Sequence, residues 1–176
     1  MRLFIAINFN HDVKDKIDRI KTLVEKNARQ GRFVHRDNLH LTLEFLGEIP
    51  EERIGDIQDA MDKLSHNPFN LKLKNLGFFK RMDGHIYWLG IQDSEELMTL
   101  QSNLHKLLLE KGFKLENRKY RPHITLGRRV KLRSFNQEEV NRLLDKIQIE
   151  VKSVDLMESK HIEGKLVYEV IYSKKL

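Results

Sequence analysis

The amino-acid sequence predicts a protein of mixed helices and strands that is built from two related lobes. Short apolar or alternating segments, which are typical of strands, take turns with segments whose apolar residues have helical spacing. Similar elements recur in the same order in the two halves of the chain. Each half also contains one His-x-Thr-x tetrapeptide, His40–Leu43 in the first and His123–Leu126 in the second.

The composition is that of a globular protein. The chain has 176 residues, of which 40% are hydrophobic and 33% charged, and this suits one domain of ordinary size. No apolar run is long enough to span a bilayer or to form a signal peptide, so we expect a cytoplasmic protein that is not bound to membranes. We also expect a monomer. Because there is no cysteine, disulfides, thiolate catalysis and thiolate-bound zinc are excluded.

The first half is predicted to contain two helices between strands. Strands are expected at residues 3–9, 39–46 and 69–73, the last with one solvated face. The first helix has Asn10 or Asp12 as its N-cap and Gly31 just past its end, and its apolar stripe is Val13, Ile17, Ile20, Val24 and Ala28. The second helix begins near Glu51, and its stripe is Ile54, Ile57, Met61 and Leu64.

The second half repeats this order after a turn at residues 80–84. A strand at 85–91 precedes a helix that Asp93 and Glu96 open as a capping box and Gly112 closes. A strand at 120–126 precedes a helix that Asn136 and Glu139 open in the same way. Two last strands are expected at 149–157 and 166–172, joined by a turn at Glu163–Gly164.

The spacing between corresponding elements is nearly constant. His40 and His123 are 83 residues apart, Leu3 and Tyr87 84, Glu51 and Asn136 85, and Phe69 and Ile149 80. We therefore expect a single domain, residues 1–176, that contains a duplicated unit with approximate halves 1–82 and 83–176.

The two tetrapeptides predict a shared site. In a strand, successive side chains point to opposite faces, so each His shares a face with its Thr while the apolar residues pack in the core. Two histidines that converge can divide the roles of acid and base at neutral pH, and threonine hydroxyls can hold phosphoryl oxygens. A single copy would be an ordinary half-buried strand. The same alternation places Glu44 beside Thr42, where it either biases the imidazole or is simply exposed.

The excess of positive charge favours a polyanionic substrate. The formal net charge is +6. Much of the excess lies around the second tetrapeptide in a segment without acids: Arg118, Lys119, Arg121, Arg128, Arg129, Lys131 and Arg133. A run of this kind is either a solvated face or, beside a site, a surface for RNA. No glycine-rich phosphate loop is present, and the motifs bring too few carboxylates together for a metal centre.

The paired motifs resemble those of the 2H phosphoesterase superfamily. The likeness covers most of the chain: an N-terminal Arg2–Ala6 strand, Asn38-Leu-His-Leu-Thr-Leu-Glu-Phe-Leu-Gly47 and Arg121-Pro-His-Ile-Thr-Leu-Gly-Arg128. Within that superfamily the chain is most similar to the RNA 2′,3′-cyclic phosphodiesterases, also called 2′-5′ RNA ligases. The resemblance implies a bilobal α+β fold, with an antiparallel sheet and outer helices in each of two pseudo-symmetric lobes around a central cleft.

The resemblance also implies an activity and a set of site residues. A terminal 2′,3′-cyclic phosphate of RNA, with tRNA fragments among the candidates, would be opened to a 2′-phosphate without metal or cofactor, and some relatives also join RNA ends reversibly. His40 would be the proton donor and His123 the proton acceptor, with Thr42 and Thr125 beside them. Two alternatives remain open: a sibling 2H activity on another cyclic or oligonucleotide phosphodiester, and an RNA-end-binding module without catalysis.

Three further residues are candidates for substrate binding: Arg128, Arg121 and Tyr120. The resemblance implies the first, because Arg128 matches a family arginine that follows the second motif and contacts phosphate. Simple alternation places Arg128 on the face opposite His123, so Gly127 must allow a bulge or the strand must end there. Tyr120 could stack on a base, as could Phe9, although core packing suits Phe9 better. The remaining histidines have no repeated context and are expected to be surface or structural residues: His11, His35, His66, His85, His105 and His161.

Overall fold

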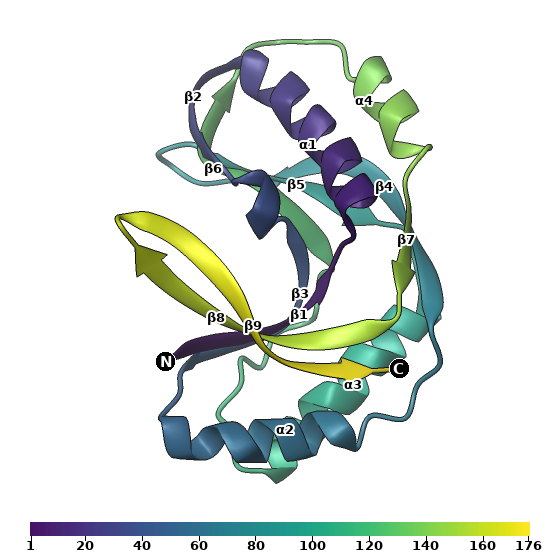
Figure 1. Cartoon of the computed structure of the whole chain (residues 1–176). Coiled ribbons are helices and arrows are strands. Elements are labelled where there is room, and N and C mark those ends of the chain that lie inside the picture. Colours follow the sequence, from purple (N-terminus) through teal and green to yellow (C-terminus); the bar gives the residue numbers. More distant parts are fainter.

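The computed structural model describes all 176 residues as an α+β fold of two antiparallel sheets and four α-helices (Figure 1). The four-stranded sheet has the order β3 (His40–Glu48), β1 (Arg2–Asn8), β8 (Ser153–Ile162), β9 (Lys165–Lys175). The five-stranded sheet has the order β2 (Ala28–Phe33), β6 (His123–Leu132), β5 (His85–Ile91), β4 (Phe69–Phe79), β7 (Gln148–Val151). The helices are α1 (His11–Lys26), α2 (Ile54–Asp62), α3 (Glu95–Glu110) and α4 (Glu138–Leu144).

The helices cover one face of each sheet. In Figure 1, α1 and α4 lie above the five-stranded sheet, and α2 and α3 lie below the four-stranded sheet. One cluster of 37 buried residues runs through both halves of the molecule. The other faces of the two sheets are turned toward each other, and β3 of one sheet contacts β6 of the other. None of the helices combines the length and the apolarity needed to cross a bilayer.

Residues Leu3–Ile7 of strand β1 are all apolar because both faces of the strand are buried there. Leu3, Ile5 and Ile7 belong to the main core, whereas Phe4 and Ala6 face the other way and pack on Met157. The strand lies between β3 and β8, so each of its edges is hydrogen-bonded to a neighbour. It therefore gives the first motif strand a rigid support.

The structure confirms two of the predicted helix ends and corrects a third. Asn10 caps α1, since its side chain accepts a hydrogen bond from the amide of Val13 at 2.9 Å. The helix ends at Lys26 rather than at Ala28, because Ala28 begins strand β2 and Gly31 lies within that strand. Gly112, with φ +80°, follows the C-cap of α3, as predicted.

The predicted capping boxes are wrong in detail. Ser94, not Asp93, caps α3 by accepting from the amide of Leu97 at 3.2 Å. Helix α4 begins at Glu138, and Asn136 accepts from the amide of that residue instead of forming a reciprocal box with Glu139. The predicted final hairpin is present, with positive φ at both Glu163 and Gly164, as tight two-residue hairpin turns require.

The two sheets do not coincide with the two halves of the sequence. The strand expected at 149–157 is divided at Lys152 into β7 and β8, which belong to different sheets. Strand β4 of the first half joins the five-stranded sheet, and β8 of the second half joins the four-stranded sheet. Strands β2 and β9 cross over in the same way, so each half contributes two strands to the sheet of the other half. The duplication of the unit stays a prediction.

The expected correspondence between Phe69 and Ile149 does not fit this arrangement. Their strands, β4 and β7, are direct neighbours in one sheet, with Leu71 opposite Ile149. An axis that relates β3 of one sheet to β6 of the other would instead match β4, the neighbour of β5, with β8, the neighbour of β1. The exchanged strands explain why the offset of this pair, 80 residues, departs most from the others.

Candidate active site

His40 stands at the start of β3 with a defined tautomer. Its Nδ1 lies 2.7 Å from the carbonyl oxygen of Asn38. Because a carbonyl only accepts, Nδ1 carries the proton and donates it, which leaves Nε2 as the nitrogen free for acid–base chemistry. The hydroxyl of Thr42 donates to Nε2 at 2.9 Å. The first tetrapeptide therefore places its His and its Thr on one face, as predicted.

His123 repeats this device at the start of β6. Its Nδ1 donates to the carbonyl oxygen of Arg121 at 2.6 Å, again the residue two positions earlier. Its Nε2 and the half-buried hydroxyl of Thr125 have no hydrogen-bond partner within the protein. Both motif strands thus present a neutral imidazole whose Nε2 carries no proton and can accept one.

Each motif strand also contains a β-bulge directly after its threonine. In β3, Thr42 and Glu44 lie opposite the consecutive residues Ala6 and Ile5, so Leu43 is the extra residue. In β6, Thr125 and Gly127 lie opposite Trp88 and Tyr87, so Leu126 is the extra residue. A bulge reverses the alternation beyond it. The residues three positions after each threonine, Phe45 and Arg128, therefore return to the face of the histidines.

The bulge at Leu126 resolves the objection to Arg128. The guanidinium is exposed, and its positive charge is among the causes that lower the pKa of His40 and of His123. Arg128 has no carboxylate within salt-bridge distance. The structure accordingly brings His40, His123 and Arg128 together, although they come from two different sheets.

The environment of both histidines favours the neutral imidazole. Burial is the largest cause that lowers the pKa of His40 to about 4, and the charges of Lys14, His123 and Arg128 add to it against the hydrogen bond to Asn38. Burial likewise lowers the pKa of His123, with Arg128 adding to the effect. In the free protein both imidazoles are therefore neutral at pH 7.

Aromatic rings enclose the two imidazoles. The ring of His40 lies 5.0 Å from that of Phe4 and 5.2 Å from that of Tyr168, between centroids. The ring of His123 lies 5.1 Å from that of Phe79 and 6.2 Å from that of Trp88. The sequence did not reveal these four aromatic residues, because they come from strands β1, β9, β4 and β5, far from the motifs along the chain. In the sequence, each of these four residues is only an aromatic residue within a predicted or possible strand, and nothing marks it as a neighbour of a histidine.

Glu44 does not lie where alternation predicts. The bulge at Leu43 turns it toward α3, where the carboxylate is 7% exposed and accepts from Nδ1 of His105 at 2.8 Å. The side-chain amide of Gln101 lies 3.3 Å from the same oxygen and donates to it. Glu44 is therefore neither on the imidazole face nor exposed, and it connects β3 to α3. His105 is a structural histidine, as expected.

Tyr120 also has a different place from the expected one. Its hydroxyl donates to the backbone carbonyl of Thr42 at 2.8 Å, and burial together with the Glu44 carboxylate raises its pKa. The ring packs against the main core. Tyr120 is thus held beneath β3 rather than presented to a base, and it ties the segment before the second motif to the first motif strand.

The remaining candidates divide between surface and core. Arg121 has an exposed side chain, and its carbonyl holds His123. Phe9 is 8% exposed and belongs to the core. His35 accepts from the amide of Asp37, and His85 stacks on Phe78 with 4.8 Å between centroids. No group of three or more histidine and carboxylate side chains is arranged to hold a metal ion.

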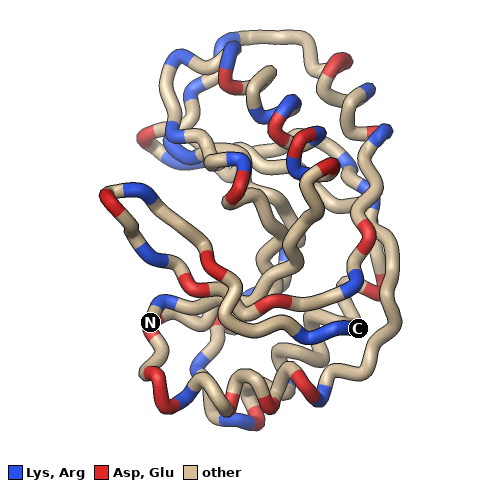
Figure 2. Tube along the Cα trace, in the orientation of Figure 1, with Lys and Arg blue, Asp and Glu red and all other residues tan.

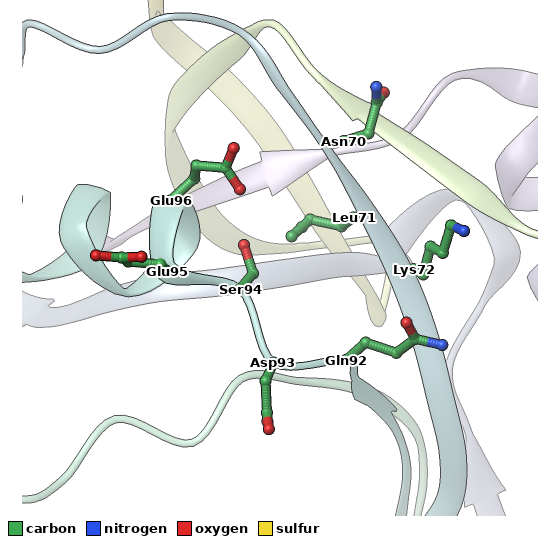
Figure 3. Close-up of a pocket in the computed structure, with 8 residues that line it drawn as sticks. All are labelled: Asn70, Leu71, Lys72, Gln92, Asp93, Ser94, Glu95 and Glu96. Atoms are coloured by element: carbon green, nitrogen blue, oxygen red, sulfur yellow. The ribbon is translucent and has the colours of Figure 1, made fainter.

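One further hollow, of about 250 Å³, lies at the start of α3 away from the motifs (Figure 3). It is lined by Asn70, Leu71, Lys72, Gln92, Asp93, Ser94, Glu95 and Glu96. Its three carboxylates outnumber its single lysine, so the charge of this hollow disfavours a phosphate. Exposed arginines, Arg121 and Arg128, instead lie close to His123 along the chain.

Comparisons with known proteins agree with this fold. The family described as the 2′-5′ RNA ligase superfamily matches residues 10–163. The RNA 2′,3′-cyclic phosphodiesterase of Thermotoga maritima is 33% identical over 98% of this chain and 94% of its own length. That of Methanocaldococcus jannaschii is 32% identical over 97% of this chain and 98% of its own length.

Solved structures show the same architecture. E. coli LigT complexed with 3′-AMP superposes with a TM-score of 0.80 at 26% identity, covering 99% of this chain and 97% of that one. The protein TT0787 of Thermus thermophilus gives a TM-score of 0.80 at 26% identity, covering 100% and 98%. The fold is that of the LigT-like phosphoesterases. The chain belongs to the 2′-5′ RNA ligase superfamily.

Proposed function

We propose that this protein opens the terminal 2′,3′-cyclic phosphate of RNA to a 2′-phosphate, with two histidines as acid and base. One observation carries the proposal. His40 and His123 each donate Nδ1–H to the carbonyl two residues earlier, so each has its Nε2 available for proton transfer. Two imidazoles fixed in the same way on contacting strands suit an in-line displacement with a proton transfer at each end.

The reaction needs one proton taken and one given. Nε2 of His123 removes a proton from water as the water oxygen forms a bond to phosphorus. The bond between phosphorus and the 3′ oxygen then breaks, and Nε2–H of His40 protonates that oxygen. The products are a 2′-phosphate and a 3′-hydroxyl, and the protein ends with the proton on His123 instead of His40, from which solvent restores the starting state.

The difference between the two histidines supports this assignment. Burial lowers the pKa of His40 to about 4, so its imidazolium, once formed, is a strong acid. Nε2 of His123 has no partner within the protein and is free to take a proton from water, whereas Nε2 of His40 is already bonded to Thr42. A phosphate anion bound beside His40 raises the pKa of His40 and so increases the fraction of protonated His40, the form that acts as an acid.

The groups around the imidazoles suit the charge on phosphorus. The hydroxyls of Thr42 and Thr125 can donate to the non-bridging oxygens, and Arg128 supplies a fixed positive charge. RNA as substrate is supported by the names of the relatives and by the basic segment around the second motif. The exposed side chain of Arg121 would contact the RNA strand. Tyr120 would not contact the RNA and instead holds the backbone of Thr42 through its hydroxyl.

The test is an assay on an oligoribonucleotide that ends in a 2′,3′-cyclic phosphate, run with and without EDTA. We expect hydrolysis to a 2′-phosphate at the same rate in both, identified by resistance of the product to enzymes that require a 3′-phosphate. Complete loss of rate on chelation would contradict the proposed mechanism. A 3′-phosphate product would reverse the leaving group and contradict the roles of the two histidines.

The roles can be separated with a substrate whose 3′ oxygen is replaced by sulfur. A thiolate leaves without a proton, so the acid is no longer needed. We expect His40→Ala to recover much of its lost rate on this substrate and His123→Ala to stay inactive. Recovery by His123→Ala instead would exchange the two roles.

Two alternative functions are distinguished by the same assay. If a second RNA with a 5′-hydroxyl replaces water, the same displacement joins the two ends through a 2′-5′ bond, and the joined product is detected by its length. A sibling activity would show turnover on another cyclic phosphodiester and none on RNA. A binding module without catalysis would retain the cyclic end unchanged, and it would not require both imidazoles.

A further inference from the structure

An unusual pair of like charges lies beside the second motif. Strand β2 forms the edge of the five-stranded sheet, and its Arg32 lies directly opposite Arg128 of β6. Residues that are directly opposite in an antiparallel pair project from the same face, with Cβ atoms about 4.5–5.5 Å apart. Two arginines in this relation repel each other, and the pair is unfavourable unless an anion compensates them.

No carboxylate compensates this pair. Neither Arg32 nor Arg128 forms a salt bridge in the protein, whereas the next arginine, Arg129, is paired with Asp83 at 3.2 Å. Both Arg32 and Arg128 are exposed. Figure 2 shows several Lys and Arg positions, with few acids, where β2 and β6 run side by side.

The position of Arg32 is fixed by the packing on either side of it. A Cβ at Gly31 would come within 2.9 Å of Cγ2 of Val130, so the two strands approach more closely than another residue would allow. Phe33, on the other side, packs against the core, and a Cβ at Gly127 would lie 3.0 Å from its ring. Since Phe33 points into the core, Arg32 points away from it, to the face that Arg128 shares with the histidines.

We propose that Arg32 binds the internucleotide phosphate next to the cyclic end of an RNA substrate, while Arg128 acts at the cyclic phosphate itself. The inference rests on the proposed function and extends it, because it predicts that the RNA strand binds along β2, the edge strand of the five-stranded sheet. Two phosphates, one for each arginine, relieve the repulsion between the two guanidinium groups. The protein then distinguishes an oligoribonucleotide from a free mononucleotide through Arg32.

The experiment compares two substrates in one set of variants. A mononucleoside 2′,3′-cyclic phosphate has no internucleotide phosphate, whereas an oligoribonucleotide with the same terminal base and cyclic end has one. Arg32→Gln should lower kcat/KM for the oligoribonucleotide about tenfold, the usual effect of losing one charge-assisted hydrogen bond, and leave the mononucleotide unchanged. Arg128→Gln should lower kcat/KM for both substrates.

The matched control is Arg19→Gln, the same loss of charge at an exposed position of α1, on the other side of the five-stranded sheet. It should leave both substrates unchanged. Arg32→Gln should also reduce the slope of log kcat/KM against log salt for the oligoribonucleotide by about 0.7, the value for one phosphate contact on a single strand. Arg19→Gln should keep the wild-type slope.

The outcomes separate this inference from the proposed function. If Arg32→Gln lowers kcat/KM equally for both substrates, or for neither, Arg32 does not bind the internucleotide phosphate and the inference is overturned. If the wild-type protein hydrolyses neither substrate, the proposed function fails instead. Circular dichroism of Arg32→Gln that matches the wild type confirms that an exposed side chain was removed without loss of the fold.

Discussion

The two motif strands share a backbone design and differ in what surrounds it. Both begin with a histidine whose Nδ1–H is donated to the carbonyl two residues earlier, and both have a bulge one residue after the threonine. Three residues after the threonine, however, the first strand has Phe45, which is 46% exposed, and the second has Arg128. In the proposed mechanism the shared part supplies proton transfer, and the variable position gives the site an aromatic side at Phe45 and a cationic side at Arg128.

The supports behind the two strands differ as well. Behind the first motif, Glu44 accepts from His105 and Gln101 of α3, and the hydroxyl of Tyr120 holds the carbonyl of Thr42. Behind the second motif, Gly127 lies where a larger residue would collide with Phe33. The first strand is thus anchored by polar contacts and the second by close packing. The two motif strands are thus alike in the hydrogen bond and the bulge that position each histidine, and they differ in the contacts that support each strand from behind.

The largest expected effect tests the shared part of the comparison. His40→Ala and His123→Ala should each lower kcat by about 100- to 10,000-fold, because each removes one proton transfer. Binding of the RNA end, measured by fluorescence anisotropy with a labelled product, should change little. His66→Ala, a histidine in the loop before β4, is the matched control and should be fully active. An active His40→Ala protein would rule out the two-histidine mechanism.

The next effect tests the position where the strands differ. Arg128→Gln should lower kcat/KM by about 10- to 100-fold, since a charge-assisted hydrogen bond to the reacting phosphate is lost. Phe45→Leu should have a smaller effect, expressed mainly in KM, because the exposed ring can contact a base or a ribose without touching phosphorus. A larger loss in Phe45→Leu than in Arg128→Gln would reverse the assignment of the two sides.

Most of the elements of the fold could be predicted from local pattern. The apolar run of β1, the helical spacing of α1 and α3 and the Glu163–Gly164 turn are strong local signals, and all are present. The division of residues 149–157 between two sheets could not be predicted, because the break at Lys152 leaves the strand pattern unchanged on both sides. Edge strand β2 was missed because its segment, Ala28–Phe33, is polar and contains glycine.

The site was predictable where it depends on the tetrapeptides and not beyond them. Alternation places His40 with Thr42 and His123 with Thr125, because no bulge lies within either pair. It fails for Glu44, since the extra residue Leu43 reverses the faces, and it would fail for Arg128 without the bulge that Gly127 suggested. The aromatic neighbours of the histidines depend on how the two sheets face each other, which no local pattern encodes.

The pH dependence should sharpen the difference between the two histidines. The pKa of His40, about 4, and the lowered pKa of His123 belong to the free protein, and kcat/KM reports groups of the free protein. The optimum of kcat/KM should therefore lie below pH 6.5, whereas bound phosphate raises both values and moves the optimum of kcat to higher pH. In Arg128→Gln a nearby cation is lost, so both optima should move upward. An optimum of kcat/KM above pH 7 in the wild-type protein would contradict the lowered values.

The same pKa shift predicts a loss of stability in acid. Between pH 6.5 and about 4 the unfolded chain protonates its histidine while folded His40 stays neutral, so the free energy of unfolding falls as pH falls through this range. The fall is up to about 3 kcal/mol from this residue alone. Urea unfolding at pH 7 and pH 4.5 should show a smaller difference between the two pH values for His40→Gln than for the wild type. If the free energy of unfolding changes equally with pH in the two proteins, groups other than His40 cause the loss of stability.

The smallest expected effect tests the hydrogen bond that joins the segment before the second motif to the first motif strand. Tyr120 precedes the second motif strand and bonds the carbonyl of Thr42 in the first, so Tyr120→Phe removes a single hydrogen bond between them and keeps the ring in the core. The free energy of unfolding should fall by about 1 kcal/mol in urea titrations. Tyr172→Phe, which removes an exposed hydroxyl bonded to Asp62, is the matched control and should change it by less. If Tyr120 only stabilises the fold, kcat stays at the wild-type value; a fall in kcat with KM unchanged would show that the bond also sets the position of Thr42 against the substrate.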